Sequence, residues 1–417
     1  MAERGHNPVG QYDIVIVGGG MVGATLAWTL QAASYRCALV ENVDIRKSTP
    51  PGYDERSIVL SYGSSRILEW LDLWSRLALH AEPIYGIHVS ERGRFGVTRI
   101  HAQEERVPAL GYVIPARSLG ELLVPKLLEH PEALQLYAPA QLLGLRQLDN
   151  TLELELRHED NPMMLRTRLL VAADGADSTV RRLLNINAAT VDYRQDAVIT
   201  NISTQCPHNN TAYERFTESG PLALLPLQPF GEERNRCAVV WTLHAGQAEE
   251  LLALDEQSFL NRLQQRFGNR LGRLLRCGSR AGYPLTLVNS ELKVGARTVL
   301  IGNAAQTLHP VAGQGFNLAL RDASILLQCL LDSSPEGDPG SSNLLADYRG
   351  RRARDQQRVI MFTDGLVRLF SNDLRPLAIA RSLGLITMDL LPGLRRRLVR
   401  QGMGLNMPLP RIGHYRQ

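Results

Sequence analysis

The hydrophobic positions near the start of the chain predict a unit of strand, turn, helix and strand. An apolar, β-branched run at Tyr12–Val17 leads into a glycine-rich turn, a helical stretch at Ala24–Ala33 and a second apolar run at Cys37–Val40. Short runs that are apolar at nearly every position are typical of strands buried on both faces of a parallel sheet. The pattern therefore predicts one βαβ unit.

The order of apolar strand, small turn and helix recurs twice further along the chain. Strands separated by so many residues can still lie in one parallel sheet when helices connect them. The second unit comprises Leu169–Ala173, Asp174–Gly175 and Val180–Leu184, and the third comprises Thr298–Ile301, Gly302–Asn303 and Asn317–Leu331.

The segments between these units have a different pattern. Gly86–Val107 and Val191–Leu243 alternate apolar and polar residues over short runs, which predicts antiparallel strands. Beyond a Pro/Gly/Ser loop at Ser333–Asn343 the chain reads as helical to about Arg400. We therefore expect a nucleotide-binding domain (residues 1–82, 108–188 and 281–360), a substrate domain (residues 83–107 and 189–280) and a C-terminal helical segment (residues 361–417).

The turn after the first strand carries a dinucleotide-binding fingerprint. Gly18, Gly20 and Gly23 have the spacing GxGxxG between a strand and a helix. Gly18 permits a tight turn, Gly20 lets a pyrophosphate approach the backbone, and Gly23 lets helix and strand pack closely. Glu41 ends the second strand, where its carboxylate can accept ribose hydroxyls and would repel a 2′-phosphate. The fold class is therefore α/β and Rossmann-like, and the fingerprint favours FAD or NAD over NADP.

Composition and charge exclude several other classes. The chain has 417 residues and a net charge of +4, and it lacks a nucleic-acid-reading motif, so we expect no nucleic acid partner. Its five cysteines show no CxxC spacing, so we expect no metal site, and reduced thiols in the cytoplasm. We also expect no signal peptide and no membrane-spanning helix.

Three motifs in order resemble the FAD-dependent aromatic hydroxylases, the fold group of para-hydroxybenzoate hydroxylase. They are the fingerprint, the "DG" motif at Asp174–Ser178 with Arg181, and the stretch GNAAQTLHPVAGQGFN at Gly302–Asn317. The resemblance extends to about Arg354 and chooses FAD over NAD. It also implies that Arg56 reaches toward the FAD phosphates and that Arg117 contacts the flavin.

Within this group the third motif is similar to that of the ubiquinone-biosynthesis hydroxylases, in particular those acting on 2-octaprenyl-6-methoxyphenol. Asn303 stands where most of the group has an aspartate bonded to the ribityl chain; it keeps an acceptor but loses the charge. The implied reaction is hydroxylation of a prenylated phenol by a flavin C4a-hydroperoxide, with NADPH or NADH as transient electron donor and O₂ as co-substrate. A sister hydroxylase for another ring position and a non-catalytic prenyl-binding escort protein are the alternatives.

The resemblance also assigns roles around the third motif. Gly302 and Asn303 contact the cofactor, and Gly313 and Gly315 let the backbone approach the flavin ring. The helix N-terminus at Phe316 and Asn317 would stabilise negative charge on reduced flavin. Asp174 would contact the side where flavin and pyridine nucleotide meet. His309 and Pro310 are the candidates nearest the reacting ring, with His309 polarising the phenol or serving as a structural histidine.

Two features bear on the substrate and its location. The expected substrate sheet carries three candidates for activating the substrate: His208, Tyr213 and Arg215. The sequence pattern does not show which of them has this role. From Asp373 to Gln417 eight arginines stand against two aspartates, interleaved with apolar residues. Such a segment suits contact with an anionic membrane surface, or with a protein complex of ubiquinone synthesis. We therefore expect a cytoplasmic protein peripheral to the inner membrane.

Overall fold

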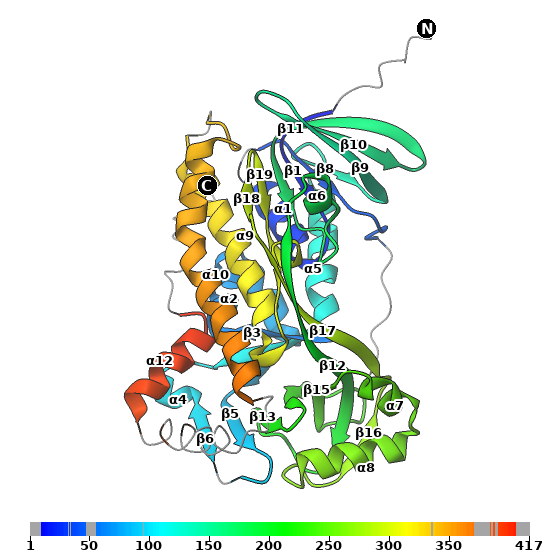
Figure 1. Cartoon of the computed structure of the whole chain (residues 1–417), viewed down its shortest axis with the longest axis vertical. Helices are drawn as coiled ribbons and strands as arrows, with labels where there is room; N and C mark the ends of the chain where they lie inside the picture. Colours follow the sequence, from blue (N-terminus) through cyan, green and yellow to red (C-terminus); the bar gives the residue numbers. More distant parts are fainter. Residues whose placement is uncertain are drawn as a thin grey trace.

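The computed structural model contains two large sheets joined by long helices (Figure 1). It describes residues 10–31, 33, 35–46, 56–94, 96–334, 337–370, 384, 387 and 391–405. The eight-stranded sheet lies at one end of the molecule and the nine-stranded sheet at the other, with α10 (Ser342–Phe370) running between them. This arrangement confirms the α/β class and the interleaving of two kinds of sheet.

The eight-stranded sheet is built from the three predicted units. Its order is β18-β19-β11-β1-β2-β8, and β9 and β10 extend β11 as an antiparallel flap. β1 pairs in parallel with both β11 and β2, and Ile14 and Ile16 of β1 are fully buried. The strands are β1 (Gly10–Val17), β2 (Cys37–Val40), β8 (Leu134–Tyr137), β9 (Ala140–Gln147), β10 (Leu152–His158), β11 (Asn161–Ala172), β18 (Val294–Gly295) and β19 (Thr298–Leu300).

Helices cover this sheet because apolar side chains project from both of its faces. Ile14 and Leu169 face a core shared with α1 (Met21–Gln31), α5 (Ala116–Leu128) and α9 (Gln314–Asp332), whereas Val15 and Leu170 face the antiparallel flap. A small three-stranded sheet, β3-β7-β4, lies beside α9. Its strands and nearby helices are β3 (Ser57–Ser61), β4 (Glu82–Ile84), β7 (Gly111–Pro115), α2 (Tyr62–Trp70), α3 (Trp74–Leu77) and η1 (Ala78–His80). The short helix α6 (Thr179–Leu183) packs instead against β9 of the antiparallel flap.

The nine-stranded sheet has the order β20-β17-β12-β15-β14-β13-β5-β6, with β16 beside β12. Alternate side chains of β12, β14 and β15 form a core with α7 (Gln247–Ala253) and α8 (Glu256–Phe267), which includes Trp241 and Phe259. The strands and the flanking α4 are β5 (Gly86–Glu91), β6 (Val97–His101), α4 (Ala102–Glu105), β12 (Ala188–Thr204), β13 (Thr211–Thr217), β14 (Gly220–Leu227), β15 (Arg236–His244), β16 (Leu274–Cys277), β17 (Ala281–Ser290) and β20 (Gln306–Thr307).

The domain boundary expected at residue 281 requires a correction. β17 pairs with β12 from Ala188 to Ile199, so it belongs to the nine-stranded sheet, and β20 extends that sheet further. The chain therefore returns to the eight-stranded sheet only at β18. The reason is that β17 continues the alternating pattern of an antiparallel strand, and its partner β12 is long enough to pair with it over two segments.

The C-terminal part of the described chain is helical, as expected. α9 starts at Gln314, earlier than the predicted Asn317, and α10 packs along it. α12 (Pro392–Gly402) returns to the nine-stranded sheet, where Val399 and Met403 are buried beside β6 and α4. Most of residues 371–390 and all of residues 406–417 lie outside the described residues, so the arginines there have no structural account.

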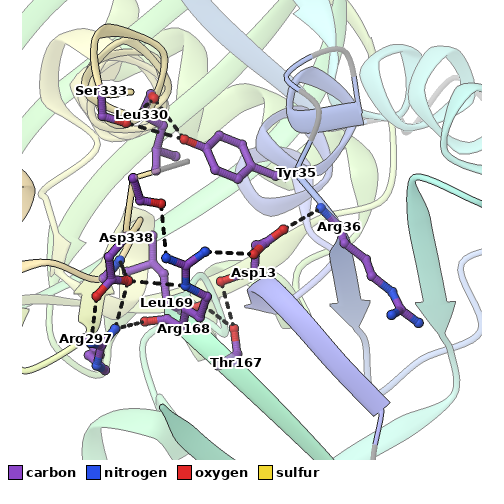
Figure 2. Close-up of polar contacts among 12 residues, drawn as sticks. Asp13, Tyr35, Arg36, Thr167, Arg168, Leu169, Arg297, Leu330, Ser333 and Asp338 are labelled. Carbon is purple, nitrogen blue, oxygen red and sulfur yellow. Dashed lines mark hydrogen bonds and ion pairs between the residues drawn. The ribbon is translucent and has the colours of Figure 1, made fainter. Parts of the chain in front are cut away.

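A polar network fastens the amino ends of the parallel strands (Figure 2). Arg297 donates two hydrogen bonds to Asp338, at 3.0 and 2.7 Å, and a third to the carbonyl of Arg168. Arg168 in turn donates to Asp13 of β1 at 3.3 Å, and Tyr35 donates to the Leu330 carbonyl at the end of α9. These contacts lie at the sheet edge opposite the glycine turn. They therefore stabilise the sheet and take no part in a ligand site at the glycine turn.

Candidate functional site

Strand register brings the three predicted turns together at one edge of the eight-stranded sheet. Val17 pairs with Ala172 and Ala172 pairs with Leu300, so the turns that follow β1, β11 and β19 leave the sheet side by side. β2 is the next strand, and Glu41 follows it. Neighbouring strands are about 4.8 Å apart, so these four positions span roughly 14 Å. A row of that length suits an extended ligand such as a dinucleotide.

The glycines of the first turn divide into packing and open positions. A Cβ on Gly23 would lie 1.9 Å from the Gly18 carbonyl oxygen, and one on Gly18 would lie 2.3 Å from the Ala173 carbonyl oxygen. Gly18 also has φ +104°, which favours glycine. A Cβ on Gly20 would meet no atom within 4 Å. Protein packing therefore explains Gly18 and Gly23, while Gly20 borders open space that a ligand can enter.

The first turn also presents unpaired backbone donors. The N–H of Ala24 bonds to the Gly20 carbonyl, so the three residues before Ala24 open α1 and have no carbonyl one turn earlier. Glu41 lies against the turn, where its carboxylate accepts the N–H groups of Gly19 and Val43. The helix N-terminus and the carboxylate thus stand together, as binding of a pyrophosphate and an adjoining ribose requires.

The DG turn is held rigidly and leaves one acceptor unused. Asp174 Oδ2 accepts the N–H of Val180 at 3.1 Å, while Oδ1 is buried without a hydrogen-bond partner in the described structure. Arg181 donates to the carbonyls of Ala176 and Ala304, at 2.6 and 2.9 Å. Because a buried carboxylate oxygen without a partner is unfavourable, Oδ1 is a natural acceptor for a ligand hydroxyl or amide.

The third turn packs against the first. Gly302, with φ +61°, begins a 3₁₀ turn (η2, Gly302–Ala304) and faces Val22 of α1, with its would-be Cβ at 3.7 Å. The Asn303 side chain is exposed beside this contact. The third motif therefore presents Asn303 at the same edge as Asp174, as the expected ribityl contact requires.

In the turn at residues 310–317, Gly313 and Asn317 hold the backbone in place through contacts that the sequence did not reveal. Gly313 has φ +59°, and a Cβ there would lie 2.8 Å from Val59. Both polar atoms of the Asn317 side chain form hydrogen bonds to the backbone. Oδ1 accepts the Ser61 N–H at 2.8 Å, and Nδ2 donates to the carbonyls of Val59 and Gly313. Its side chain therefore fixes the turn, and the expected charge-stabilising role rests with backbone groups alone.

The start of α9 is the second open backbone surface. The 3₁₀ turn η3 (Val311–Gly313) runs into α9, whose N-cap, Gly313, provides no side-chain hydrogen bond. A Cβ on Gly315 would meet no atom within 4 Å, whereas the Phe316 ring packs into the core beside α9. Free N–H groups and a bare glycine at a helix start can receive a planar ring that carries negative charge.

His309 lies beneath this turn and is 1% exposed. Its Nδ1 accepts the Val311 N–H at 3.2 Å, so the neutral ring carries its proton on Nε2, which is buried without a hydrogen-bond partner among the described residues. The Tyr193 ring meets it edge-on at 5.4 Å. Burial lowers the pKa of His309 to about 4, so at neutral pH the ring is an uncharged donor. Pro310 beside it accepts the Gly313 N–H at 3.0 Å.

The two expected arginines lie at one end of the β3–β7 pair. Arg56 immediately precedes β3, and its carbonyl accepts the Ala116 N–H at 2.8 Å, so Arg56 and Arg117 are brought together. The Arg56 guanidinium stacks over Tyr283 of β17 at 4.8 Å, and Arg117 pairs with Glu121 one turn along α5. Their predicted contacts to FAD stay predictions.

A buried ionic network behind the third turn was missed from the sequence. Gln306 of β20 donates to Asp322 of α9 at 3.2 Å, and Asp322 accepts from Arg352 of α10 at 2.7 Å. Arg352 also bonds Asp355, which accepts from Arg321 at 3.0 Å. Asp322 and Arg352 are 0% and 1% exposed, so neither charge is solvated. The sign of this network in the sequence is the pair of charged residues, Arg321 and Asp322, inside a largely apolar helix.

The candidates on the nine-stranded sheet do not face the turns. Tyr213 packs edge-on against Phe267 of α8 at 5.6 Å, and Arg215 shares its face by strand alternation. His208 is buried, with Nε2 3.3 Å from the Leu227 carbonyl and Nδ1 accepting the Asn210 N–H. Tyr213 and Arg215 therefore belong to the far face of the sheet, and His208 to the loop before β13.

These observations fit an FAD molecule along the row of turns. Two open glycines, two helix starts and the unused Asp174 oxygen mark a path from Glu41 to the 310–317 turn. Glycines that packing does not require are expected where a ligand approaches the backbone. The adenosine half would lie by Glu41 and the flavin ring by Gly315, which is the distribution predicted from the sequence.

Comparison with known proteins agrees with this reading. A family profile described as an FAD binding domain matches residues 11–363. The chain is 36% identical over 393 residues to a ubiquinone hydroxylase of Rhodospirillum rubrum, covering 94% of this chain and 89% of that protein. It is 30% identical over 401 residues to the 3-demethoxyubiquinol 3-hydroxylase of Escherichia coli, covering 94% and 98%.

A solved structure shows the same fold. The p-nitrophenol 4-monooxygenase of Pseudomonas putida aligns with a TM-score of 0.75 at 18% identity, covering 95% of this chain and 97% of that one. At this identity the likeness concerns the fold, in which both sheets and the connecting helices are matched. The family profile and the two curated relatives carry the assignment beyond the fold.

Proposed function

The chain belongs to the FAD-dependent aromatic hydroxylases, and we propose that it hydroxylates the ring of a prenylated phenol in ubiquinone synthesis. The substrate proposed is a 2-polyprenyl-6-methoxyphenol, converted to the 1,4-benzoquinol. The supporting observation is that a full-length relative at 36% identity is a ubiquinone hydroxylase. As a monooxygenase, the protein inserts one oxygen atom of O₂ and reduces the other to water.

Bound FAD supplies the ring that takes electrons and activates O₂. The residues of this chain provide position and environment. The first N–H groups of α9 would stabilise negative charge on a flavin ring held there, and Gly315 leaves room for the ring to approach. His309 Nε2 is buried without a partner among the described residues, so the uncharged ring can offer a hydrogen bond to a ligand without bringing a charge. The apolar residues around it exclude water, which would otherwise compete for the activated oxygen.

NADPH or NADH is the proposed electron donor, bound transiently beside the flavin. The overall stoichiometry is one phenol, one O₂, one NAD(P)H and one proton, giving the hydroxylated ring, NAD(P)⁺ and water. The test uses purified yellow protein, 2-geranyl-6-methoxyphenol as a short-chain probe, and both pyridine nucleotides. We expect substrate-stimulated bleaching of the flavin under anaerobic conditions and, in air, a product containing one added oxygen atom.

The position of hydroxylation has a second candidate. The Escherichia coli relative at 30% identity is a 3-hydroxylase of demethoxyubiquinol, which favours a different ring carbon. Mass spectrometry of the product with each of the two ring types as substrate separates the candidates. Turnover of a demethoxyubiquinol analogue alone would overturn the assignment to the methoxyphenol. Failure to consume either ring would instead overturn the prenylphenol proposal.

We also propose that α12 brings the protein to an anionic membrane surface. No described helix combines the length and apolarity needed to cross a bilayer. Arg396, Arg397 and Arg400 are exposed on α12, while Val399 is buried on its inner side. Arg395 is committed to Glu104 at 2.7 Å and does not contribute to this surface, whereas Arg396 lies 3.8 Å from Glu105 but keeps 60% of its side chain exposed.

A vesicle assay tests this proposal. Vesicles containing phosphatidylglycerol should retain the wild type at low salt and lose a triple variant in which Arg396, Arg397 and Arg400 become glutamine. A matched triple variant at exposed arginines elsewhere, Arg157, Arg182 and Arg262, should still bind. Equal retention of both variants would contradict the proposal and direct attention to a protein complex of ubiquinone synthesis as the partner of α12.

A further inference from the structure

Glu214 is an acidic residue in the middle of β13, between the two side chains that face α8. Its neighbours Tyr213 and Arg215 belong to the α8 side of the sheet. Side chains alternate along a strand, so Glu214 projects to the opposite face together with Ala212 and Phe216. Through Phe216 that face packs against Val311 and against Val367 of α10. A sequence pattern could not have shown which of the two faces is functional.

Packing on either side places Glu214 opposite the 310–317 turn. Phe216 packs with Val311, the second residue after His309, and with Val367 of α10. Ala212 packs in a separate cluster that also contacts Val59, the residue against which Gly313 lies. Phe216 therefore reaches the start of the turn, while Ala212 belongs to a cluster whose neighbour Val59 borders the middle of the turn. The carboxyl lies between these two clusters on the same face.

The strands on either side of β13 leave the Glu214 carboxyl in apolar surroundings. Its partner in β5 is Val89 and its partner in β14 is Ala223. Oε2 is buried and has no hydrogen-bond partner in the described part of the chain. Burial raises the pKa of Glu214 to about 7, with no charged neighbour contributing to the change. Glu214 as a whole is half-buried, but a buried carboxylate oxygen without a partner is unfavourable for folding, which points to a functional reason for its presence.

The other titratable groups near this face are already committed. His309 is uncharged at neutral pH and accepts a backbone N–H. Tyr193 donates to Asp364 of α10 at 3.1 Å, Asp364 pairs with Arg368, and Glu91 of β5 is 3.5 Å from Arg94. Tyr62 adjoins the Ala212 cluster. Among the described residues named here, none supplies a cation to Glu214, so its free oxygen is available to a ligand.

We propose that Glu214 is the catalytic residue that accepts the hydroxyl proton of the phenol substrate. This inference rests on the proposed function and adds the residue that the sequence left unidentified. The O–H bond of the phenol breaks as the proton moves to a Glu214 oxygen, and the electron pair stays on the phenol oxygen. The resulting phenolate is richer in electrons at its ortho and para carbons, where the new C–O bond forms.

The chemistry of the carboxyl suits this task. An ordinary phenol has a pKa of about 10 and an ordinary glutamate about 4.3, so normal proton transfer between them is strongly unfavourable. A base works best when its pKa approaches the working pH and the pKa of its acid partner. The apolar surroundings of Glu214 bring it closer to both conditions.

The test compares Glu214→Gln with a matched control on 2-geranyl-6-methoxyphenol, using the FAD-loaded enzyme. The control is Glu249→Gln, an exposed glutamate on α7 at the other face of the same sheet. We expect Glu214→Gln to hydroxylate the probe about 100-fold more slowly, as for loss of a general base. More hydrogen peroxide should form per NADPH consumed, while FAD affinity stays unchanged. Glu249→Gln should match the wild type.

The pH profile separates a catalytic from a structural role. In the wild type, hydroxylation should increase as pH rises through about 7, because Glu214 must be ionised to accept a proton. Glu214→Gln should lose this dependence, and Glu214→Asp should recover part of it. A Glu214→Gln enzyme with the wild-type pH profile and coupling would overturn the inference and leave the proposed function standing. A wild type that does not hydroxylate any prenylphenol would overturn both.

Thermal stability gives a readout without turnover. Because the pKa of Glu214 is raised on folding, its neutral form is favoured in the folded state, and ionisation destabilises the fold as pH rises from about 4.5 to about 7. The melting temperature of Glu214→Gln relative to wild type should therefore increase from pH 5 to pH 8. A variant that is less stable than the wild type at pH 8 would show that the carboxyl is structural, against the inference.

Discussion

Arg181 donates a hydrogen bond to the carbonyl of Ala304 at 2.9 Å, across 123 positions of sequence. The same guanidinium holds the Ala176 carbonyl of its own turn at 2.6 Å. One side chain therefore fixes the DG turn to the turn that carries Asn303. The distance between Asp174 and Asn303, on which a shared ligand depends, is set by this residue rather than by the sheet alone.

Replacing Arg181 should therefore weaken FAD binding more than it destabilises the fold. Hydrogen bonds from a charged donor contribute about 1.5–3 kcal/mol each, and part of that holds the ligand geometry. We expect Arg181→Met to bind FAD at least about tenfold more weakly, measured by flavin fluorescence. Arg182→Met is the control, since Arg182 is exposed and bonds only Thr179 within its own helix among the described residues. Equal affinity in both variants would contradict the role given to Arg181.

We expect alanine substitutions at Gly20 and Gly23 of the first turn to affect the stability of the apoprotein differently. A Cβ at Gly20 meets nothing, so Gly20→Ala should leave the free energy of unfolding of the apoprotein within about 0.5 kcal/mol of wild type. It should nevertheless lower FAD affinity, because the methyl group occupies the path of the pyrophosphate. Gly23→Ala places Cβ 1.9 Å from the Gly18 oxygen and should destabilise the apoprotein by about 1–3 kcal/mol. Chemical denaturation and FAD titration of the two variants test this contrast.

Gly315 should behave like Gly20 at the other end of the ligand. It lies in the first turn of α9 and borders open space. Alanine loses less conformational freedom than glycine in a helix, so Gly315→Ala should raise the unfolding free energy of the apoprotein by up to about 1 kcal/mol. FAD binding should weaken, since the ring can no longer approach the backbone. A stabilised variant with unchanged flavin affinity would place the ring elsewhere.

We expect the buried His309 to make the folding stability of the protein depend on pH. Burial lowers its folded pKa to about 4, below the unfolded value, so the neutral ring stabilises the fold fully above pH 6.5. As pH falls from 6.5 to 4 this contribution, up to about 3 kcal/mol, is lost. His309→Gln should show a flatter decline in melting temperature over that range. His130→Gln, at an exposed site, should follow the wild type; parallel curves for all three proteins would refute the assignment.

We expect replacement of Asp338 to lower the folding stability of the protein and to leave the candidate site intact. Its carboxylate receives two hydrogen bonds from Arg297, which hold its pKa below the usual range (Figure 2). Asp338→Asn should lower the unfolding free energy by about 1–3 kcal/mol at pH 7, and by less as acid protonates the wild-type carboxyl. FAD affinity should stay unchanged because the network lies at the opposite sheet edge. Asp149→Asn, in an exposed turn, is the control for both measurements.

The sequence was sufficient for the elements whose pattern is local. Buried parallel strands such as Cys37–Val40 are apolar at every position, so burial on both faces can be read from four residues. Gly18 and Gly23 were also legible, because a tight turn and a close helix–strand contact each require glycine at a fixed spacing. The three motifs in order were enough to identify an FAD enzyme.

Tertiary contacts decided what the local pattern could not. The side chain of Asn317 is fully engaged with Val59, Ser61 and Gly313, and the predicted contact of this helix start with the flavin stays a prediction. The boundary at residue 281 was wrong because β17 pairs with a strand nearly 100 residues earlier. Neither partner is visible from the residues themselves, since hydrogen bonds between distant segments leave no periodic signal.

The sequence by itself determined the cofactor and the strand–turn–helix frame that binds it, because those depend on glycine spacing and apolar runs. Only the tertiary structure decided which face of the nine-stranded sheet packs against the 310–317 turn. Tyr213 and Arg215 were visible as polar residues on an alternating strand, and so was Glu214 between them. The packing of Phe216 on Val311 and of Tyr213 on Phe267 is what separates their roles, because alternation defines two faces and says nothing about what covers each.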